Sequence, residues 1–413
     1  MTDSHARPAR GRILFVDDDP LVLAGLRRAL RHLRTDFDLE FAESGLRALD
    51  ILASAEYDVV VSDMRMPGMD GAALLAEVQR RHPRTVRIVL SGQSDQAQIM
   101  RCLGCAHRFL PKPCEPAELD RVLAQISLIR SSLVHERFRE IVARMDRIPA
   151  VPILYLRIVE ALQKPEVGVD EVAELIEQEP STTAGLLRVV NSAYFGLAER
   201  IFAPRDAVRY LGLDMVRALI LADGTYRQME AWPGAAEAIE LVWHHSMEVA
   251  VLAGDIARGE GASPRTTDEC FVAGLLHDIG KIVLAVNFRE SWTFVEREMA
   301  VHRRPCHEAE HDVFGVTHAD LAGGIFGLWG LPGGIVDAVQ FHHRPGQLKS
   351  ANLTPALVVH CADLLVHEFS TGNGGAEGHA ADRTALEKAG LGHRWEAWRQ
   401  LAASRRQNRQ GPG

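Results

Sequence analysis

Short apolar runs alternate with amphipathic helical stretches over residues 12–130. The run DVVVS at 58–62 shows the type, because consecutive β-branched residues suit a parallel strand that is buried on both faces. Strands are expected at 12–16, 38–41, 58–62, 86–90 and 108–110, and helices at 21–33, 45–53, 71–81, 93–102 and 116–129. Strands that alternate with helices predict a doubly wound α/β fold, in which helices cover both faces of a parallel sheet.

Helical periodicity replaces this pattern in the rest of the chain. A long helical stretch covers residues 115–145, and Pro149 and Pro152 end it because proline disrupts a helix interior. Nearly every later segment up to about residue 370 also has helical spacing, for example 169–179, 182–191, 207–222, 241–258 and 271–276. The pattern therefore predicts an all-α second domain.

These patterns divide the chain into consecutive parts. A disordered N-terminus at 1–11 is expected to precede the α/β domain at 12–130, a linker helix at 131–146 and the all-α domain at 147–370. Residues 371–413 are expected to form a flexible loop, a short helix and a frayed basic tail. Leu133, Ile141 and Met145 lie beyond the first domain, so either the second domain or a second protomer must cover them. The sequence is therefore compatible with a homodimer.

Composition and charge exclude several classes of protein. The formal net charge of -9 argues against sequence-independent nucleic-acid binding, which needs a basic face. No apolar run approaches the roughly 18–20 residues of a membrane span, and the polar N-terminus lacks a signal-peptide core. The sparse cysteines are expected to be reduced thiols, and no second ligand pair stands near the CxxC of Cys102 and Cys105 to make a zinc site. We therefore expect a cytoplasmic protein.

Acidic residues stand at the ends of the predicted strands. Asp17 and Asp18 end the first strand and Asp63 ends the third, at the edge where doubly wound sheets carry their sites. Three converging carboxylates repel one another unless a cation lies between them, and hard oxygen ligands suit Mg²⁺. Ser91 ends the fourth strand and Lys112 follows the fifth, which adds a hydroxyl and an ammonium for a phosphoryl group. One such acid would be an ordinary turn residue, but the whole cluster predicts Asp63 as a nucleophile.

Four motifs in this domain resemble the receiver domain of two-component response regulators: VDDD (16–19), SDMRMPGMDG (62–71), LSG (90–92) and FLPKP (109–113). The resemblance covers about residues 12–130 and implies the flavodoxin-like form of the α/β fold. It implies a sensor histidine kinase as partner. The residues that it implies are Asp63 as phosphoacceptor, Asp17, Asp18, Asp63 and the backbone carbonyl of Arg65 as Mg²⁺ ligands, Ser91 and Lys112 as phosphoryl contacts, and Phe109 as switch aromatic.

Histidines are concentrated in the second domain. Of 18 histidines, 11 fall between His244 and His367. His277 and Asp278 adjoin in AGLLHDIGK (273–281), an apolar segment expected to be helical, where their burial is costly unless something pairs them. Mixed imidazole and carboxylate ligands suit Mn, Fe, Ni or Zn more than Ca, although each residue alone would be an ordinary core or capping group. The candidate ligands are His245, His277, Asp278, His318, His342, His343 and Asp363.

The order His245, His277-Asp278, Asp363 resembles the HD superfamily of metal-dependent phosphohydrolases. His318 and the pair His342-His343 resemble the extra ligands of the HD-GYP cyclic-dinucleotide phosphodiesterases. Two departures stand against that subgroup. RPGQLKS follows His343, so the glycine-tyrosine-proline signature is absent, and Leu241 stands where a glutamate ligand is expected.

The second domain resembles the HDOD domain more closely, an HD-related output domain that is usually regarded as non-catalytic. The resemblance covers about residues 147–370. Asn191 lies within one of its motifs and is expected to bond or pack within a helix, without a catalytic role. The motifs include IPAVP (148–152), IEQEPSTTAGLLRVVNSAYFG (176–196), WHHS (243–246), GLLHDIGK (274–281) and GVTHADLAGGIFGLWGLP (315–332).

Two hypotheses for the function follow. In the favoured one, phosphorylation of Asp63 controls the HDOD domain, which acts through contacts with a downstream signalling protein. The alternative is a metal-dependent phosphohydrolase gated by the receiver, which the retained His277-Asp278 pair and Asp363 favour and the two departures disfavour. A transcription factor is disfavoured, because no helix-turn-helix follows the receiver and the chain is acidic.

Overall fold

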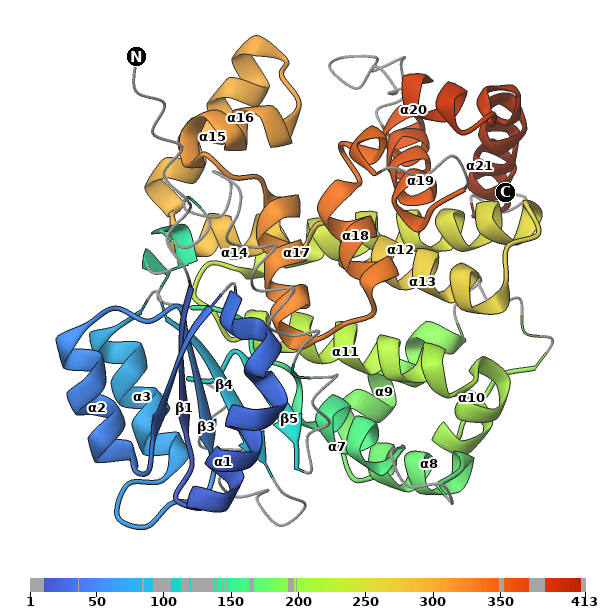
Figure 1. The fold of residues 1–413 in the computed structure, drawn as a ribbon. Coiled ribbons are helices and arrows are strands. Elements are labelled where there is room, and N and C mark those ends of the chain that lie inside the picture. The colour runs from blue at the N-terminus through green and yellow to red at the C-terminus, as the bar shows by residue number, and fades with distance from the viewer. Residues whose placement is uncertain are drawn as a thin grey trace, which may run out of the picture. The chain divides into compact units, whose positions relative to one another are not determined.

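The computed structural model divides the chain into two compact units, Met1–Arg144 with Leu328–Gly330 and Met145–Gly327 with Leu331–Gly413 (Figure 1). The structure describes residues 11–35, 37–83, 85–91, 105–112, 119, 137, 140–142, 144–145, 147–162, 167–191, 197, 199–348, 353–370 and 383–409. The helices expected at 93–102 and 116–129 lie outside these residues apart from Leu119, as do Cys102 and most of the expected linker. Within the described residues, no helix is long and apolar enough to cross a membrane.

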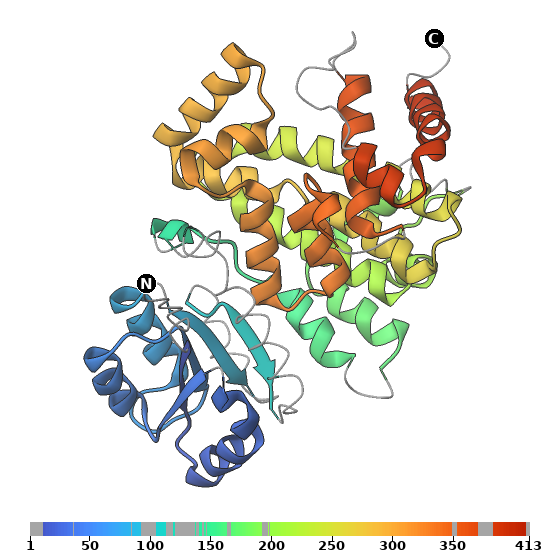
Figure 2. The same cartoon turned by 45° about the horizontal axis from the view of Figure 1, so that its top comes forward.

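The first unit is built on a parallel sheet with the strand order β2-β1-β3-β4-β5. Helices α2 and α3 cover one face and α1 covers the other (Figures 1 and 2). Alternate residues of each strand serve the two faces, so Leu14 packs with α2 and α3 while Ile13 packs with α1. This arrangement confirms the predicted doubly wound fold. The elements are β1 (Gly11–Val16), α1 (Pro20–Ala29), η1 (Leu30–Thr35), β2 (Phe37–Ala42), α2 (Gly45–Ser54), β3 (Val59–Asp63), α3 (Gly71–Arg81), β4 (Val86–Ser91) and β5 (Arg108–Pro111).

The second unit is helical throughout its described residues, which confirms the predicted all-α domain. Helix α12 packs against α13 and α19, and α18 packs against the same two helices. The elements are α7 (Ile153–Ala161), α8 (Val169–Glu177), α9 (Pro180–Val190), α10 (Pro204–Leu211), α11 (Leu213–Glu230), α12 (Ala236–Gly259), α13 (Pro264–Leu276), α14 (Ile279–Asn287), α15 (Arg289–His302), α16 (Cys306–Phe314), α17 (His318–Trp329), α18 (Gly333–Phe341), η2 (Pro345–Gln347), α19 (Pro355–Ser370), α20 (Arg383–Lys388), η3 (Gly392–Arg394) and α21 (Trp395–Arg409).

Two local predictions for the second unit are wrong. The helix expected at 207–222 is divided into α10 and α11 at Gly212, whose φ of 80° glycine adopts without steric cost. The pair His277-Asp278 was expected within a helix, but it forms the turn where α13 ends and α14 begins. A turn lets both side chains point toward one centre, which adjacent residues of a continuous helix do not do.

The basic end of the chain is ordered as α21, where a frayed tail was expected. Trp398 is buried there, and its indole Nε1 donates a hydrogen bond of 2.8 Å to Glu260. Arg394 also donates to Glu260, and Arg399 donates to Glu368 of α19 at 2.7 Å. The prediction was wrong because the acids that pair with these side chains are distant in sequence.

Candidate functional site

The acids predicted in the first unit meet a lysine at the carboxyl edge of the sheet. Asp17 follows β1, Asp63 ends β3, and Lys112 follows β5. The Lys112 ammonium lies 2.6 Å from Asp63 Oδ1 and 2.7 Å from Asp17 Oδ2. Asp18 offers a further carboxylate oxygen, and one oxygen from each of the three acids lies within 4.8 Å of the others. The strand ends therefore bring four of the predicted residues together.

Burial raises the free-energy cost of holding these charged groups close together. Asp17 and Asp63 are 2% and 7% exposed. Burial raises the pKa of Asp63, and the nearby Asp17 adds to the rise while Lys112 opposes it. Burial acts against the Lys112 ammonium, but its contacts with Asp17 and Asp63 raise the pKa of Lys112 overall. One lysine shared by these carboxylates leaves negative charge in excess, and an all-oxygen donor set fits a hard cation such as Mg²⁺.

The remaining predicted residues of the first unit are placed in part. Ser91 ends β4 and Phe109 lies in β5, but their side chains are outside the described residues. The Arg65 backbone lies beside the cluster, because its N–H donates to Asp63 Oδ2 at 3.1 Å. The loop that contains Arg65 is closed by a hydrogen bond of 2.9 Å from the Gly71 N–H to the Met64 carbonyl. The backbone of this loop is thus held against the phosphoacceptor candidate.

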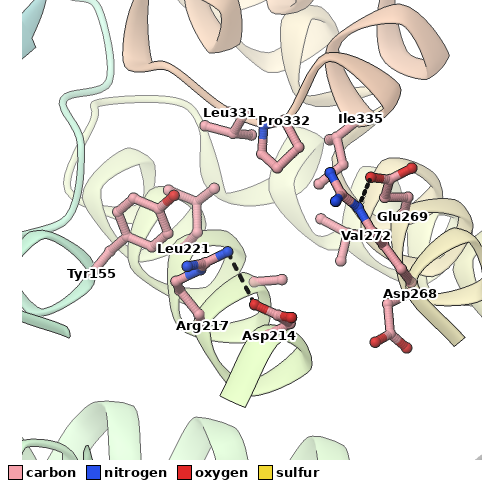
Figure 3. Close-up of a pocket in the computed structure, with 12 residues that line it drawn as sticks. Tyr155, Asp214, Arg217, Leu221, Asp268, Glu269, Val272, Leu331, Pro332 and Ile335 are labelled. Carbon is pink, nitrogen blue, oxygen red and sulfur yellow. Dashed lines mark hydrogen bonds and ion pairs between the residues drawn. The ribbon is translucent and has the colours of Figure 1, made fainter. Parts of the chain in front are cut away.

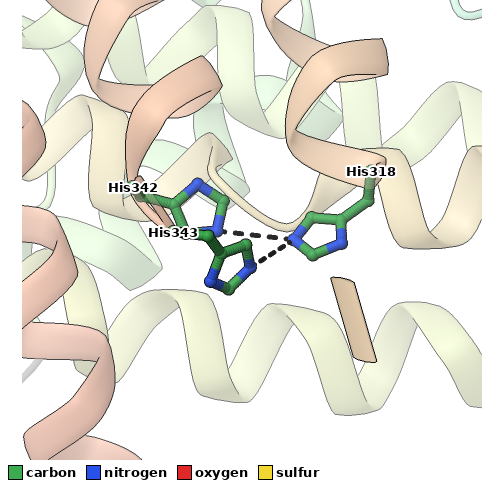
Figure 4. A group of neighbouring side chains, drawn as sticks. All are labelled: His318, His342 and His343. Carbon is green, nitrogen blue, oxygen red and sulfur yellow. Dashed lines mark hydrogen bonds between the residues drawn. The ribbon is translucent and has the colours of Figure 1, made fainter. Parts of the chain in front are cut away.

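All seven ligand candidates of the second unit converge, although they come from separate elements. We call His318, His342 and His343 the inner set, and His245, His277 and Asp363 the outer set; each offers donor atoms within 4.8 Å of one another. In the inner set, His318 Nε2 lies 3.4 Å from His342 Nε2 and 3.1 Å from His343 Nε2 (Figure 4). In the outer set, Asp363 Oδ1 lies 2.9 Å from His245 Nε2 and 3.8 Å from His277 Nε2.

Asp278 lies between the two sets. Its Oδ1 is 3.1 Å from His318 Nε2 of the inner set and 3.4 Å from His277 Nε2 of the outer set. Its Oδ2 is 3.7 Å from His245 Nε2. A carboxylate in this position can give one oxygen to each of two ions, so the donors suit either one metal ion or two.

The other ring nitrogens show which way the histidines are oriented. His277 Nδ1 and His342 Nδ1 each lie 2.7 Å from a backbone carbonyl, of Gly274 and Val339. Since a carbonyl only accepts, both rings carry the proton on Nδ1 and direct the Nε2 lone pair at the cluster. His277 Nε2 has no hydrogen-bond partner within the described part of the chain. This is the arrangement that metal-ligating histidines adopt, and it fits a borderline ion such as Mn, Fe, Ni or Zn.

Comparison with protein families agrees with both units. The model of the response regulator receiver domain matches residues 13–124, and the model of the HDOD domain matches residues 148–345. The chain is a receiver–HDOD protein. This is the architecture of a two-component response regulator.

Known relatives match the receiver–HDOD protein in parts. An uncharacterized protein of Treponema pallidum is 25% identical over 231 residues, which are 55% of this chain and 44% of that protein. The DNA-binding transcriptional regulator NtrC of Escherichia coli is 35% identical over 127 residues, 30% of this chain and 25% of NtrC. The chain thus spans less than half the length of these two relatives. An HDOD domain protein of unknown function from Geobacter sulfurreducens has a similar structure, with 28% identity, a TM-score of 0.51, and coverage of 65% of this chain and 92% of that one.

Three residues of the HDOD centre were missed by the sequence analysis. Lys281 donates a hydrogen bond of 2.7 Å to Asp278 Oδ2 from one turn further along the chain. Glu310 is fully buried and its Oε2 accepts from both the backbone N–H and Nδ1 of His318, at 2.8 and 2.6 Å. His367 Nε2 lies 3.3 Å from Asp363 Oδ1. The spacing of three or four residues to a candidate ligand was the available signal for Lys281 and His367; Glu310 had none.

These neighbours set the charge of the centre. Burial opposes the ionised form of Asp278, but His277 and Lys281 hold the pKa of Asp278 well below its usual range. Burial likewise opposes the charged form of His318, yet Glu310 raises the pKa of His318 to about 9. A metal ion would therefore displace a proton from His318 on binding.

A separate pocket of about 220 Å³ lies in the HDOD unit (Figure 3). Apolar side chains such as Tyr155 and Ile335 form part of its wall. Its two arginines are already paired within their own helices, Arg217 with Asp214 and Arg265 with Glu269, each at 3.2 Å. Asp268 completes the acidic side, and burial, with Asp214 nearby, raises its pKa to about 6.

Proposed function

We propose that the receiver domain takes a phosphoryl group on Asp63 from a sensor histidine kinase, with Mg²⁺ as cofactor. The observation that carries this proposal is the convergence of Asp17 and Asp63 on the Lys112 ammonium from three separate strand ends. Asp17, Asp18 and Asp63 would hold the ion, which when bound offsets negative charge on the phosphoryl oxygens.

The side chains of the receiver supply the rest of the reaction. An oxygen of Asp63 attacks phosphorus, the bond from phosphorus to the donor's leaving group breaks, and an acyl phosphate forms on Asp63. Lys112, which already contacts Asp63 Oδ1, offsets the charge of the new group. Because Lys112 directly follows β5, its movement toward a phosphoryl oxygen pulls on the strand that contains Phe109. Phosphorylation is thereby converted into a change of packing.

Labelling with a small phosphodonor and Mg²⁺ tests the phosphoacceptor. We expect wild type to be labelled and Asp63→Asn to remain unlabelled, because the amide that replaces the Asp63 carboxylate is a poor nucleophile. Asp50→Asn, which changes an exposed acid on α2, is the matched control and should be labelled like wild type. Equal labelling of Asp63→Asn and wild type would refute the assignment.

The HDOD domain would deliver the output through protein contacts. Two large apolar side chains on α15 support this: Phe294 and Val301 are 60% and 62% exposed, and their spacing of seven residues places them on one side of the helix. Limited proteolysis of the full chain measures whether the HDOD domain responds. We expect the phosphodonor to change cleavage within it in wild type, whereas Lys112→Ala should keep some labelling and lose the change. Identical cleavage with and without the phosphodonor would contradict a regulated output.

A second candidate function is a metal-dependent phosphohydrolase, and the seven convergent ligands with Asp278 between the two sets are the observation that favours it. In such an enzyme the bound metal would supply Lewis acidity, and the partly buried Lys281 beside Asp278 would offset negative charge on a phosphate substrate. The absent glycine-tyrosine-proline signature remains the argument against a cyclic-dinucleotide substrate.

Metal analysis of protein purified without chelator separates the two candidates. If the centre binds metal, His277→Ala should reduce its content sharply, because His277 directs its Nε2 at the cluster. Undiminished metal in that variant would place the ion elsewhere. Metal-containing protein should then be assayed for hydrolysis of a cyclic dinucleotide, and absence of turnover would return the HDOD domain to a role in protein contacts alone.

A further inference from the structure

His367 lies beside the outer set, on the same helix as Asp363. The two residues are four positions apart on α19, so their side chains emerge from one face of that helix. His367 Nε2 is 3.3 Å from Asp363 Oδ1, and the ring centroids of His367 and His245 are 4.5 Å apart. A third imidazole therefore reaches the oxygen that His245 and His277 already approach.

We propose that His367 is a fourth ligand of a metal ion held by the outer set, in the role that a glutamate at position 241 would otherwise fill. This inference rests on the proposed metal centre, and it adds to that centre a ligand that the HD pattern does not contain. The ion would then have a donor set of three imidazoles and one carboxylate.

The distances around Asp363 carry the proposal. Three Nε2 atoms surround Asp363 Oδ1, at 2.9 Å from His245, 3.3 Å from His367 and 3.8 Å from His277. Ligand atoms about 2.0–2.1 Å from a tetrahedral ion lie about 3.4 Å from one another. The three separations from Asp363 Oδ1 lie on either side of that value, so each imidazole is within reach of an ion that Asp363 Oδ1 binds.

The residue at position 241 cannot bind a metal ion, so another residue must supply the missing ligand. Leu241 is 68% exposed on α12, four residues before His245, and has no donor atom. Helix α19 packs against α12, so a donor from α19 can come close to His245. His367 is the residue of α19 that does so, one turn beyond Asp363.

The donor set also defines the class of metal. Three imidazoles with one carboxylate suit Zn²⁺, Co²⁺, Ni²⁺ or Fe²⁺, while Mg²⁺ and Ca²⁺ prefer oxygen ligands. The side chains of His245 and His367 are 17% and 37% exposed, whereas that of His277 is fully buried. The ion would thus enter past His367, and this ligand would be the one that can exchange with solvent.

Co²⁺ titration of the full chain tests the proposal, because its visible absorption reports both the affinity and the coordination of the ion. The protein is first stripped with a chelator and then titrated with Co²⁺ alone. We expect His367→Ala to weaken the binding of one equivalent at least tenfold and to alter its absorption bands. His367→Glu, which restores an oxygen donor of similar reach, should recover most of the affinity with a different spectrum.

The matched control is His302→Ala. His302 also lies four residues after an acid on a helix, 3.8 Å from Glu298, but its side chain is 59% exposed and outside the centre. It should bind Co²⁺ like wild type. If wild type binds Co²⁺ and His367→Ala matches it in affinity and spectrum, His367 is only a hydrogen-bonding partner of Asp363 and the inference is wrong. If wild type binds no Co²⁺, the metal centre itself is refuted and the inference with it.

Discussion

In the receiver domain, Lys112 reaches Asp63 from a different strand end, whereas in the HDOD domain Lys281 reaches Asp278 from the next turn of the same stretch of chain. The two contacts are almost equally short, at 2.6 and 2.7 Å. Around them the chemistry differs, because further carboxylates surround the first lysine while imidazoles surround the second carboxylate. A buried acid is thus stabilised in both domains by a lysine, and the other neighbours decide which kind of metal suits each site.

The comparison also separates two ways in which a sequence encodes a site. The receiver cluster depends on the order of strands, because parallel strands bring their carboxyl ends to one edge wherever they lie in the chain. The HDOD centre depends on a turn between helices and on four further segments that pack around it. A change in backbone packing should therefore damage the second centre more than the first.

Two glycines give the sharpest test of that difference. A Cβ on Gly71 would overlap the carbonyl oxygen of Asp63, and a Cβ on Gly280 would overlap that of His318. We expect Gly280→Ala to destabilise its domain by about 3 kcal/mol and Gly71→Ala by about 2 kcal/mol, because Gly280 is enclosed between packed helices while Gly71 adjoins a loop. Chemical denaturation of the full chain, followed by phosphodonor labelling and metal content, measures both.

The control for these substitutions is Gly25→Ala in α1, where a Cβ would meet nothing within 4 Å. Alanine has the better helix propensity, so this variant should gain about 0.5–1 kcal/mol. Each glycine should also affect its own site only, with Gly71→Ala impairing labelling and Gly280→Ala impairing metal binding. Equal losses at both sites in either variant would argue against two independently built centres.

The difference between the sites also accounts for what could be predicted. Asp17, Asp63 and Lys112 each come after an apolar run. The hydrophobic pattern and the order of the strands therefore predicted from the sequence alone that these side chains meet. The seven candidate ligands of the HDOD domain were predicted from their resemblance to an ordered motif, and the structure brings all of them together. The helical pattern of the sequence, in contrast, continues through Gly212 without a break. Only the positive φ of Gly212 shows that the chain turns there.

Residues that act through tertiary contacts were beyond the reach of the sequence. Glu310 has no periodic or motif signal, and its importance follows only from the two hydrogen bonds that it accepts from His318. Trp398 and Arg399 resembled part of a frayed tail, because their partners Glu260 and Glu368 are more than 30 residues away. Local spacing predicts which elements form, but it does not predict which distant elements meet.

Glu310 provides the next test, since it has no counterpart among the described residues of the receiver cluster. By accepting from His318 Nδ1 it fixes the ring with Nε2 toward the inner set. We expect Glu310→Ala to weaken Zn²⁺ binding about 10–100-fold. Glu310→Gln should keep an acceptor but lower the pKa of His318 from about 9, so that affinity rises less steeply between pH 7 and 9. Competition titrations with Zn²⁺ at both pH values measure the two effects, and unchanged affinity in Glu310→Ala would exclude the role.

The control lies on the same helix. Glu308 is exposed on α16 and pairs with Arg304 at 3.7 Å, away from the histidines. Glu308→Ala should therefore bind Zn²⁺ like wild type at both pH values.

Asp268 gives the smallest expected effect and extends the comparison to a half-buried acid that has no ion-pair partner in the described chain. Burial, with Asp214 nearby, raises its pKa from 3.8 to about 6. The folded state therefore holds this proton more tightly than the unfolded state, so the stabilisation is complete below about pH 4 and is lost as the pH rises through 6.

Asp268→Asn removes the ionisation, and we expect it to be about 1 kcal/mol more stable than wild type at pH 7, after allowance for solvent screening, with the difference vanishing near pH 4. Urea denaturation at pH 4, 5, 6 and 7 measures this, and Glu237→Gln, an exposed acid on α12, should show no such trend. If the difference in unfolding free energy between Asp268→Asn and wild type is the same at every pH, the amide acts by altering packing. An unpaired acid then costs this domain no more stability than the acids that are paired with lysine.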